Sequence, residues 1–335
     1  MGLLALLAII SAGLFSDGSA RADGHIRELV AFEERQFPEG LSVSPDGTIL
    51  VGILSTGEVV RVTPNGTAGT LGQLPLPAGG LLVGIHAVDS SNVFALLNTE
   101  DESNGVWHVG QQGVMQIAQL PPGLLNDIVA DSSGRLLVTD SVGGRIYAVH
   151  RDGSVETWAE DPLLLGNVDE PGPLGFPVGA NGIVLTPGGD AAYVAVSEKA
   201  RIVRIEIAAD GSAGQLSVTA TDPVLGGADG LDLSSDGTLY VAVNGQNQIV
   251  AVDTASGSVE VLAAGEPFRF PAVARLSPDE NTLYVTNFDG LVMFGLAEGP
   301  AMTGLLAMDL SAFADTKPPS IQPPATGSGG LTARD

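Results

Sequence analysis

The sequence predicts an all-β fold, a six-bladed β-propeller with four-stranded antiparallel blades. Three observations carry this prediction. One pattern recurs six times, in which an apolar segment, a Gly/Asp turn and a second apolar segment follow one another. The copies recur roughly every 40 to 55 residues, a period typical of propeller blades. No segment after the first 22 residues sustains the apolar period of a helix.

The repeats can be divided into strands directly. Five clear copies and a weaker second one begin, in chain order, at Phe37, Leu82, Leu124, Gly179, Gly227 and Phe270. In the third copy the pattern predicts strands over Asp127–Ala130, Arg135–Thr139, Arg145–Val149 and Val155–Trp158, joined by Gly-containing turns. The second strand of each copy is the most apolar, so we expect it to be buried on both faces.

The two chain ends complete the ring in this interpretation. The last repeat lacks an outermost strand, and His25–Phe32 has the apolar alternation to supply it. Pairing the two ends would protect an exposed sheet edge. A parallel β-helix is the structural alternative, but its repeat is shorter.

Residues 1–22 resemble a signal peptide, which predicts a secreted or periplasmic protein. Leu3–Ile10 is apolar and Ala20-Arg21-Ala22 forms an A-x-A-type cleavage site, although no Lys or Arg precedes the apolar run. A membrane anchor or an unprocessed apolar tail is the alternative. We expect the propeller to cover residues 23–315, followed by a disordered Pro/Gly/Ser-rich tail over residues 316–335.

Composition excludes several kinds of function. The formal net charge is −25, which disfavours nucleic acid as a partner, and no basic cluster or amphipathic helix predicts membrane binding after signal cleavage. The chain has no Cys, so disulfides, thiol nucleophiles and zinc–thiolate sites are excluded.

The residues at the start of each inner strand are expected to ring the channel mouth. Aligning the repeats on their first turn gives, in order, Glu39, Gly84, Asn126, Asn181, Asp229 and Ala272. Four of them carry oxygen ligands, which suit a hard cation such as Ca²⁺ or Mg²⁺, and two carboxylates balance its charge. The alternative is structural, because Asn181-Gly182 and Asp229-Gly230 are also typical of tight turns.

The repeats resemble the senescence-marker-protein/gluconolactonase/LRE-like family of the calcium-dependent phosphotriesterase superfamily. The resemblance covers about residues 37 to 290 and is carried by FPEG, NDIVADSSGRLLVTDS, GANGI, GADGLDLSSDGTLYVAVN and FPAVARLSPDENTLYVTN. It implies a catalytic Ca²⁺ on Glu39, Asn126, Asn181 and Asp229. Gluconolactonase-type members carry an Arg just before the first Asn, which here is preceded by Leu125. Paraoxonase-type members use a His in blade two, where this chain has His86 near the aligned position.

The resemblance implies a metal-dependent hydrolase of lactone, ester or phosphotriester substrates, which are small molecules. Ca²⁺ would polarise the carbonyl, and Asp229 is the first candidate for general base, with Asp127 second. Asp127 at a turn or facing solvent is the structural alternative. A non-catalytic binding or scaffold propeller with a structural cation is the competing function, and a non-hydrolytic enzyme like the strictosidine-synthase-like relatives is a third.

Two loops and four aromatic side chains are expected to shape the pocket. The 161–178 insertion is a candidate lid, and the acidic 98–105 loop should share its end of the channel. Four phenylalanines approach the mouth and offer apolar walls for a substrate, or pack between blades: Phe37, Phe176, Phe268 and Phe270.

Overall fold

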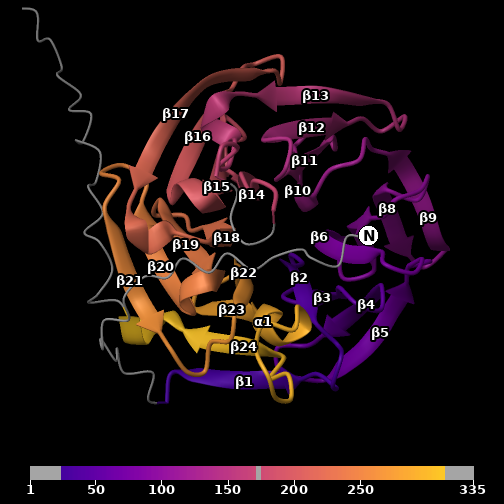
Figure 1. The fold of residues 1–335 in the computed structure, drawn as a ribbon, viewed down its shortest axis with the longest axis vertical. Helices are drawn as coiled ribbons and strands as arrows, with labels where there is room; N and C mark the ends of the chain where they lie inside the picture. Colours follow the sequence, from indigo (N-terminus) through magenta and orange to yellow (C-terminus); the bar gives the residue numbers. More distant parts are fainter. Residues whose placement is uncertain (1–23, 171–174, 314–335) are drawn as a thin grey trace, which may run out of the picture.

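The computed structural model describes residues 24–170 and 175–313. Six four-stranded antiparallel sheets radiate from a central axis, as Figure 1 shows, and this confirms the predicted six-bladed propeller. The expected leader at residues 1–22 and the expected tail at 316–335 lie outside the described residues. Within the described ranges, no helix has the length and apolar character needed to cross a membrane.

The strands follow one another from the axis outwards in each blade. Blade one holds β2 (Pro38–Val43), β3 (Ile49–Ile53), β4 (Glu58–Val62) and β5 (Ala68–Gln73), and blade two holds β6 (Leu81–Asp89), β7 (Asn92–Asn98), β8 (Gly105–Gly110) and β9 (Gly113–Gln119). Blade three holds β10 (Leu125–Ala130), β11 (Leu136–Asp140), β12 (Arg145–Val149) and β13 (Val155–Glu160). Blade four holds β14 (Ala180–Leu185), β15 (Ala191–Val196), β16 (Arg201–Ile207) and β17 (Ala213–Thr221). Blade five holds β18 (Ala228–Leu233), β19 (Thr238–Val243), β20 (Gln248–Asp253) and β21 (Val259–Ala264). Blade six holds β22 (Pro271–Leu276), β23 (Thr282–Asn287), β24 (Gly304–Asp309) and β1 (Ile26–Ala31).

The ring closes through the two chain ends. The N-terminal strand β1 pairs antiparallel with β24, with Ile26 opposite Met308 and Ala31 opposite Gly304. The prediction that His25–Phe32 supplies the outer strand of the last blade is therefore confirmed. Helix is almost absent from the described residues: α1 (Gly290–Met293) is one turn long, and five short 3₁₀ turns accompany it.

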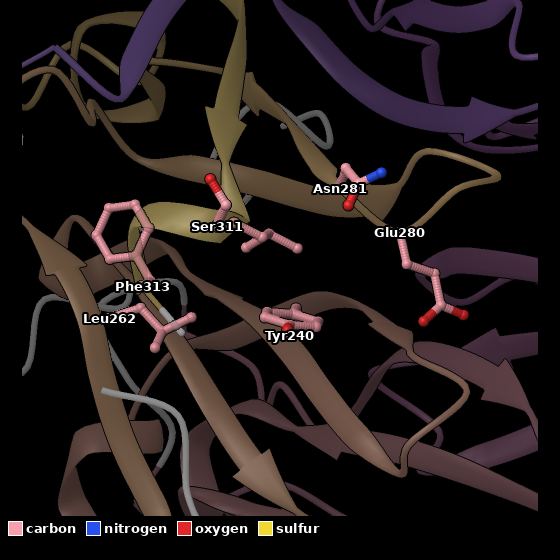
Figure 2. A pocket seen from close by; sticks show the side chains of 7 residues that line it. Tyr240, Leu262, Glu280, Asn281, Ser311 and Phe313 are labelled. Carbon is pink, nitrogen blue, oxygen red and sulfur yellow. The ribbon is translucent and has the colours of Figure 1, made fainter. Parts of the chain in front are cut away.

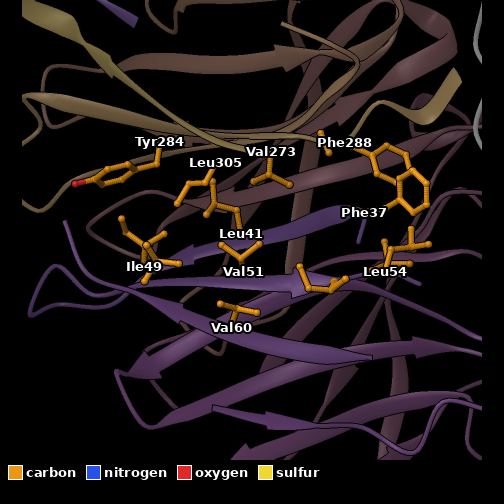
Figure 3. Close-up of a cluster of buried hydrophobic side chains, with 14 of the residues drawn as sticks. Phe37, Leu41, Ile49, Val51, Leu54, Val60, Val273, Tyr284, Phe288 and Leu305 are labelled. Atoms are coloured by element: carbon orange, nitrogen blue, oxygen red, sulfur yellow. The ribbon is translucent and has the colours of Figure 1, made fainter. Parts of the chain in front are cut away.

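The core lies between adjacent blades. The second strands are almost entirely buried, and β3, β11, β15 and β19 are buried at every position. Figure 3 shows the cluster between blades one and six, where Leu41 and Val51 face Val273 and Leu305. Each blade buries both faces of its sheet in this way, so burial of apolar area holds neighbouring blades together.

A β-bulge recurs in all six inner strands. In blade one, Pro38 pairs with Ile53 and Leu41 pairs with Val51, so three steps on β2 match two steps on β3. The same shift occurs in the other five inner strands. A bulge re-aims the side chains beside it. Residues three apart therefore occupy equivalent places above and below the bulge, and they form two rings around the channel.

The register corrects one aligned position. Ile85 pairs with Ala95 as Leu41 pairs with Val51, so the residue equivalent to Glu39 in blade two is Val83, not Gly84. Ring one is defined as Glu39, Val83, Asn126, Asn181, Asp229 and Ala272. Ring two is defined as Ser42, His86, Val129, Val184, Asp232 and Arg275.

Candidate metal centre

Ring one contains all four predicted ligands, each as the second residue of its inner strand. Glu39 is in β2, Asn126 in β10, Asn181 in β14 and Asp229 in β18. Their exposed fractions are only 2%, 3%, 0% and 2%. The other two members, Val83 and Ala272, are buried and apolar. The two carboxylates and two amides are thus held on rigid strands in a site shielded from water.

The backbone beside these residues is fixed by side chains of the preceding blade. Thr139 Oγ1 in blade three donates to the Asn181 carbonyl (2.7 Å). Across the closure of the ring, Thr286 Oγ1 in blade six donates to the Glu39 carbonyl (3.0 Å). Asn98 in blade two donates to and accepts from the backbone of the residue before Asn126. The backbone of ring one is therefore held in part by side chains of neighbouring blades.

Polar atoms without partners mark ring one. Buried atoms with no hydrogen-bond partner occur on all four residues, namely Glu39 Oε2, Asn126 Nδ2, Asn181 Oδ1 and Asp229 Oδ1. The two ends of an amide side chain are exchangeable by rotation, so Asn126 can present Oδ1 instead. A buried unpaired polar atom costs about 1–3 kcal/mol. Four of them in one ring are the donor set that an oxygen-liganded cation needs.

The surroundings of ring one disfavour the ionised forms of its two carboxyl groups. Burial, the charge of Asp229 and the charge of Asp127 raise the pKa of Glu39 well above its usual range. Burial also raises the pKa of Asp229 to about 8, against the opposing effect of a hydrogen bond from Asn244. Without a compensating cation, the surroundings of ring one therefore favour the protonated forms of both carboxyl groups. A divalent cation would favour both ionised forms.

Two residues that sequence reasoning missed orient the ring. Asn244 Nδ2 donates to Asp229 Oδ2 (3.0 Å), and Asn181 Nδ2 donates to Ser197 Oγ (2.8 Å). Both begin one-turn 3₁₀ segments directly after the second strands of blades five and four. The sequence did contain a signal for these two residues, because each is a polar residue that directly follows the second strand of its blade.

The structure overturns the tight-turn alternative for Asn181-Gly182 and Asp229-Gly230. Both glycines lie within inner strands, and neither has positive φ. A Cβ on Gly182 would lie 2.3 Å from the Asp229 carbonyl oxygen. Glycine is therefore required by the close approach of neighbouring inner strands around the channel.

Asp127 lies directly beside ring one but is engaged elsewhere. Its carboxylate accepts two hydrogen bonds from Arg275 Nη2 (3.0 and 3.2 Å), and backbone N–H donors of Ile128 and Ile183 add 2.9 and 3.0 Å bonds. The side chains of Asp127 and Arg275 are 6% and 12% exposed. The pair links blade three with blade six across the channel, so Asp127 is a positioning residue and is poorly suited to be a general base.

Ring two lines a cavity of about 160 Å³ at the far end of the channel. Arg275 Nη1 donates to the Leu231 carbonyl, and Asp232 accepts hydrogen bonds from two backbone N–H groups, those of Leu233 and Leu276. Burial, together with the positive charge of Arg275, lowers the pKa of His86 to about 4. His86 is thus a neutral imidazole in ring two, below the bulge and away from the four proposed ligands.

The remaining candidate features lie away from ring one. A cavity of about 190 Å³ between blades five and six is lined by Tyr240, Leu262, Glu280, Asn281, Leu310, Ser311 and Phe313 (Figure 2). Phe268 packs in the core between these same blades and is not a wall of the mouth. Within residues 24–170 and 175–313, no three His, Cys, Asp or Glu side chains converge on a metal position; ring one combines two carboxylates with two amides.

The fold and ring one together define a class: six-bladed propellers with a buried, oxygen-rich ring in the central channel. The family model described as the SMP-30/Gluconolactonase/LRE-like region matches residues 95–289, more than half of the chain. The chain belongs to this family.

Solved structures share the fold at low sequence identity. A gluconolactonase from Xanthomonas campestris superposes with a TM-score of 0.61 at 14% identity, covering 85% of this chain and 89% of that one. The calcium-binding protein regucalcin from Agrobacterium tumefaciens gives 0.61 at 17%, with 84% and 92% covered. Virginiamycin B lyase from Staphylococcus aureus gives 0.56 at 18%, with 78% and 81% covered. No curated protein matches the chain in sequence. Because these neighbours differ in activity, function has to be argued from the site.

Proposed function

We propose that the chain is a divalent-cation-dependent hydrolase of lactone or ester substrates, a class that extends to phosphotriesters, with Ca²⁺ as the expected cation. The observation that carries the proposal is the set of buried, unpartnered polar atoms on all four predicted ligands. The family and its gluconolactonase and regucalcin neighbours support the same class of site.

The residues of ring one fit a hard divalent cation. Glu39 and Asp229 would supply two negative charges, and Asn126 and Asn181 neutral oxygens, a donor set typical of Ca²⁺ sites. A bound divalent cation with open positions polarises a carbonyl or phosphoryl oxygen and stabilises the oxyanion that forms.

Asp229 is the residue that we assign to proton transfer. Its Oδ2 is held by Asn244, while Oδ1 has no partner within the described chain. Burial raises its pKa to about 8 in the calcium-free protein, and a bound cation would favour the ionised form, which is the form that accepts a proton. In this proposal Asp229 takes the proton of the attacking water, and Asp127 holds blade three in place.

The test uses the chain from residue 23 onwards after treatment with a chelator. A panel of lactones, aryl esters and an aryl phosphotriester is assayed with and without Ca²⁺, beside the Asp229→Ala variant. We expect turnover that requires Ca²⁺ and that the variant loses. Calcium-dependent thermal stabilisation without turnover of any substrate would favour the scaffold alternative instead. We also propose that the enzyme acts outside the cytoplasm, because residues 1–22 are expected to be a signal peptide. N-terminal sequencing of the exported protein tests this proposal.

A further inference from the structure

Two insertions lie at the end of the channel where the inner strands begin. The first connects β13 to β14, and the second, residues 288–303, connects β23 to β24 and includes α1. The corresponding connection in blade three, residues 141–144, is much shorter. Figure 1 shows α1 beside β23 in blade six. The channel therefore carries extra chain at the end that holds ring one.

The two insertions meet across the channel. Leu291 of the blade-six insertion packs against Val178, which precedes β14 of blade four, and Phe176 packs against the same Val178. The inner strands of blades four and six are not neighbours, because the inner strand of blade five lies between them. Their contact therefore joins two blades that are not adjacent, at the end of the channel where the inner strands begin.

Residues beside the ligands extend this contact. Phe37 lies two residues before Glu39, and Leu124 lies two residues before Asn126; both are buried. They belong to the apolar cluster against which Phe176 and Leu291 also pack. We define the apolar cap as Phe37, Leu124, Phe176, Val178 and Leu291. It contains no charged or amide side chain, and it lies at the same end of the channel as ring one, whose proposed ligands are at most 3% exposed.

The composition of the cap decides what it binds well. Alkyl or aryl groups replace its internal contacts with equivalent apolar contacts. The hydroxyl groups of a sugar would lose their bonds to water and find no partner on these side chains. The blade-six insertion continues the apolar surface outwards, since Leu296 and Met302 are 52% and 54% exposed.

Building on the proposed hydrolase function, we propose that the substrates are lactones or esters with an apolar alkyl or aryl substituent, bound by the apolar cap, rather than polyhydroxylated sugar lactones. The hydrolysis balances simply. Water adds to the carbonyl carbon, the ring C–O bond breaks, and the alkoxide leaving group takes up the proton that Asp229 received.

The test compares kcat/KM for glucono-δ-lactone and for γ-lactones bearing no chain, a butyl chain and a hexyl chain. We expect each added CH₂ to raise kcat/KM roughly fourfold until the cap is filled, and the sugar lactone to react at least about 10-fold more slowly than the hexyl lactone. Leu291→Ala and Phe176→Ala should flatten the dependence on chain length. Met115→Ala, on the outer strand β9 with a side chain 60% exposed, is the matched control and should leave it unchanged.

Failure of this inference can be told apart from failure of the proposed function. Equal or faster turnover of the sugar lactone, or no dependence on chain length, would overturn the cap's role while leaving the hydrolase intact. If no lactone is turned over, the unreactive ketone 2-hexylcyclopentanone serves as the probe. Calorimetric binding that weakens at least about fivefold in Leu291→Ala supports the cap, and absence of binding refutes it.

Discussion

Ring one and ring two lie three residues apart on the same inner strands, yet they treat their buried charges in opposite ways. In ring two the carboxylate of Asp232 accepts two backbone hydrogen bonds, and the guanidinium of Arg275 meets the carboxylate of Asp127. In ring one Glu39 and Asp229 repel each other, and each keeps an unpartnered oxygen.

The difference shows that burial alone does not explain ring one. The same scaffold satisfies buried charges below the bulge with a cation from its own sequence, so the unpaired oxygens above it are not a general property of the channel. A buried charge is tolerated when it is paired, and costs several kcal/mol when it is not. The charged groups of ring two find partners within the protein, whereas those of ring one keep unpaired atoms, which the proposed cation would satisfy.

Removing the guanidinium group of Arg275 from ring two should have the largest effect on the stability of the protein. Arg275→Met leaves Asp127 buried without its partner, and we expect the free energy of unfolding to fall by about 3–5 kcal/mol. Chemical denaturation measures this loss. The double variant Asp127→Asn/Arg275→Met should recover much of it, whereas simple additivity of the two single changes would show that the pair is not coupled.

Replacing one carboxylate of ring one should not destabilise the calcium-free protein, in contrast to the loss of Arg275. Glu39→Gln removes a carboxyl group whose ionised form is disfavoured by burial and by Asp229, so the calcium-free protein should be unchanged or more stable. Its Ca²⁺ affinity should fall about 100-fold, or about 2.7 kcal/mol. Titration calorimetry and thermal unfolding in chelator give the two readouts. Unaltered affinity would remove Glu39 from the ligand set.

The comparison also predicts a pH dependence. The folded-state pKa of Asp229 is raised from 3.8 to about 8, so folding favours the protonated carboxyl. This stabilisation is complete below about pH 4 and is lost as the pH rises towards 8, by up to about 1.4 kcal/mol per pH unit and proton. Calcium-free protein should therefore lose stability between about pH 5 and 8.

Calcium binding at pH 7 should then release protons, which calorimetry in buffers of different ionisation enthalpy detects. Asp229→Asn is the control and should release fewer. Calcium uptake without proton release at pH 7 would contradict the raised pKa values of ring one.

The smallest expected effect is that of a positioning residue. Asn244→Ala removes the hydrogen bond that lowers the pKa of Asp229. We expect the lower limb of the pH profile of kcat/KM to move upwards, and stability to fall by about 1 kcal/mol. A loss of stability with an unmoved pH profile would make Asn244 purely structural.

Sequence reasoning predicted much of the architecture because the repeats encode it locally. Alternating apolar residues between Gly/Asp turns gave all four strands of blade three to within two residues, and the apolar alternation of His25–Phe32 gave the closing strand. The four polar members of ring one also followed from the repeats, because each occupies the same place at the start of an apolar strand.

Other features depend on long-range contacts or on local irregularity. The weak second repeat was misaligned by one residue, because its bulge and its extended strand β6 leave no landmark to separate Val83 from Gly84. Nothing in the sequence pairs Asp127 with Arg275, since the two lie on opposite blades. Phe268 and Phe270 are two residues apart, yet Phe268 packs between blades five and six and Phe270 between blades six and one.

The pairing of β1 with β24 determines when the ring can close during synthesis of the chain. β1 leaves the ribosome first, and its partner at Gly304–Asp309 leaves almost a full chain later. Until then the N-terminal segment has no sheet to join, and blade one and blade six cannot dock. The last contact to form is therefore the one of greatest sequence separation, which makes folding slow and leaves the nascent chain open to chaperones.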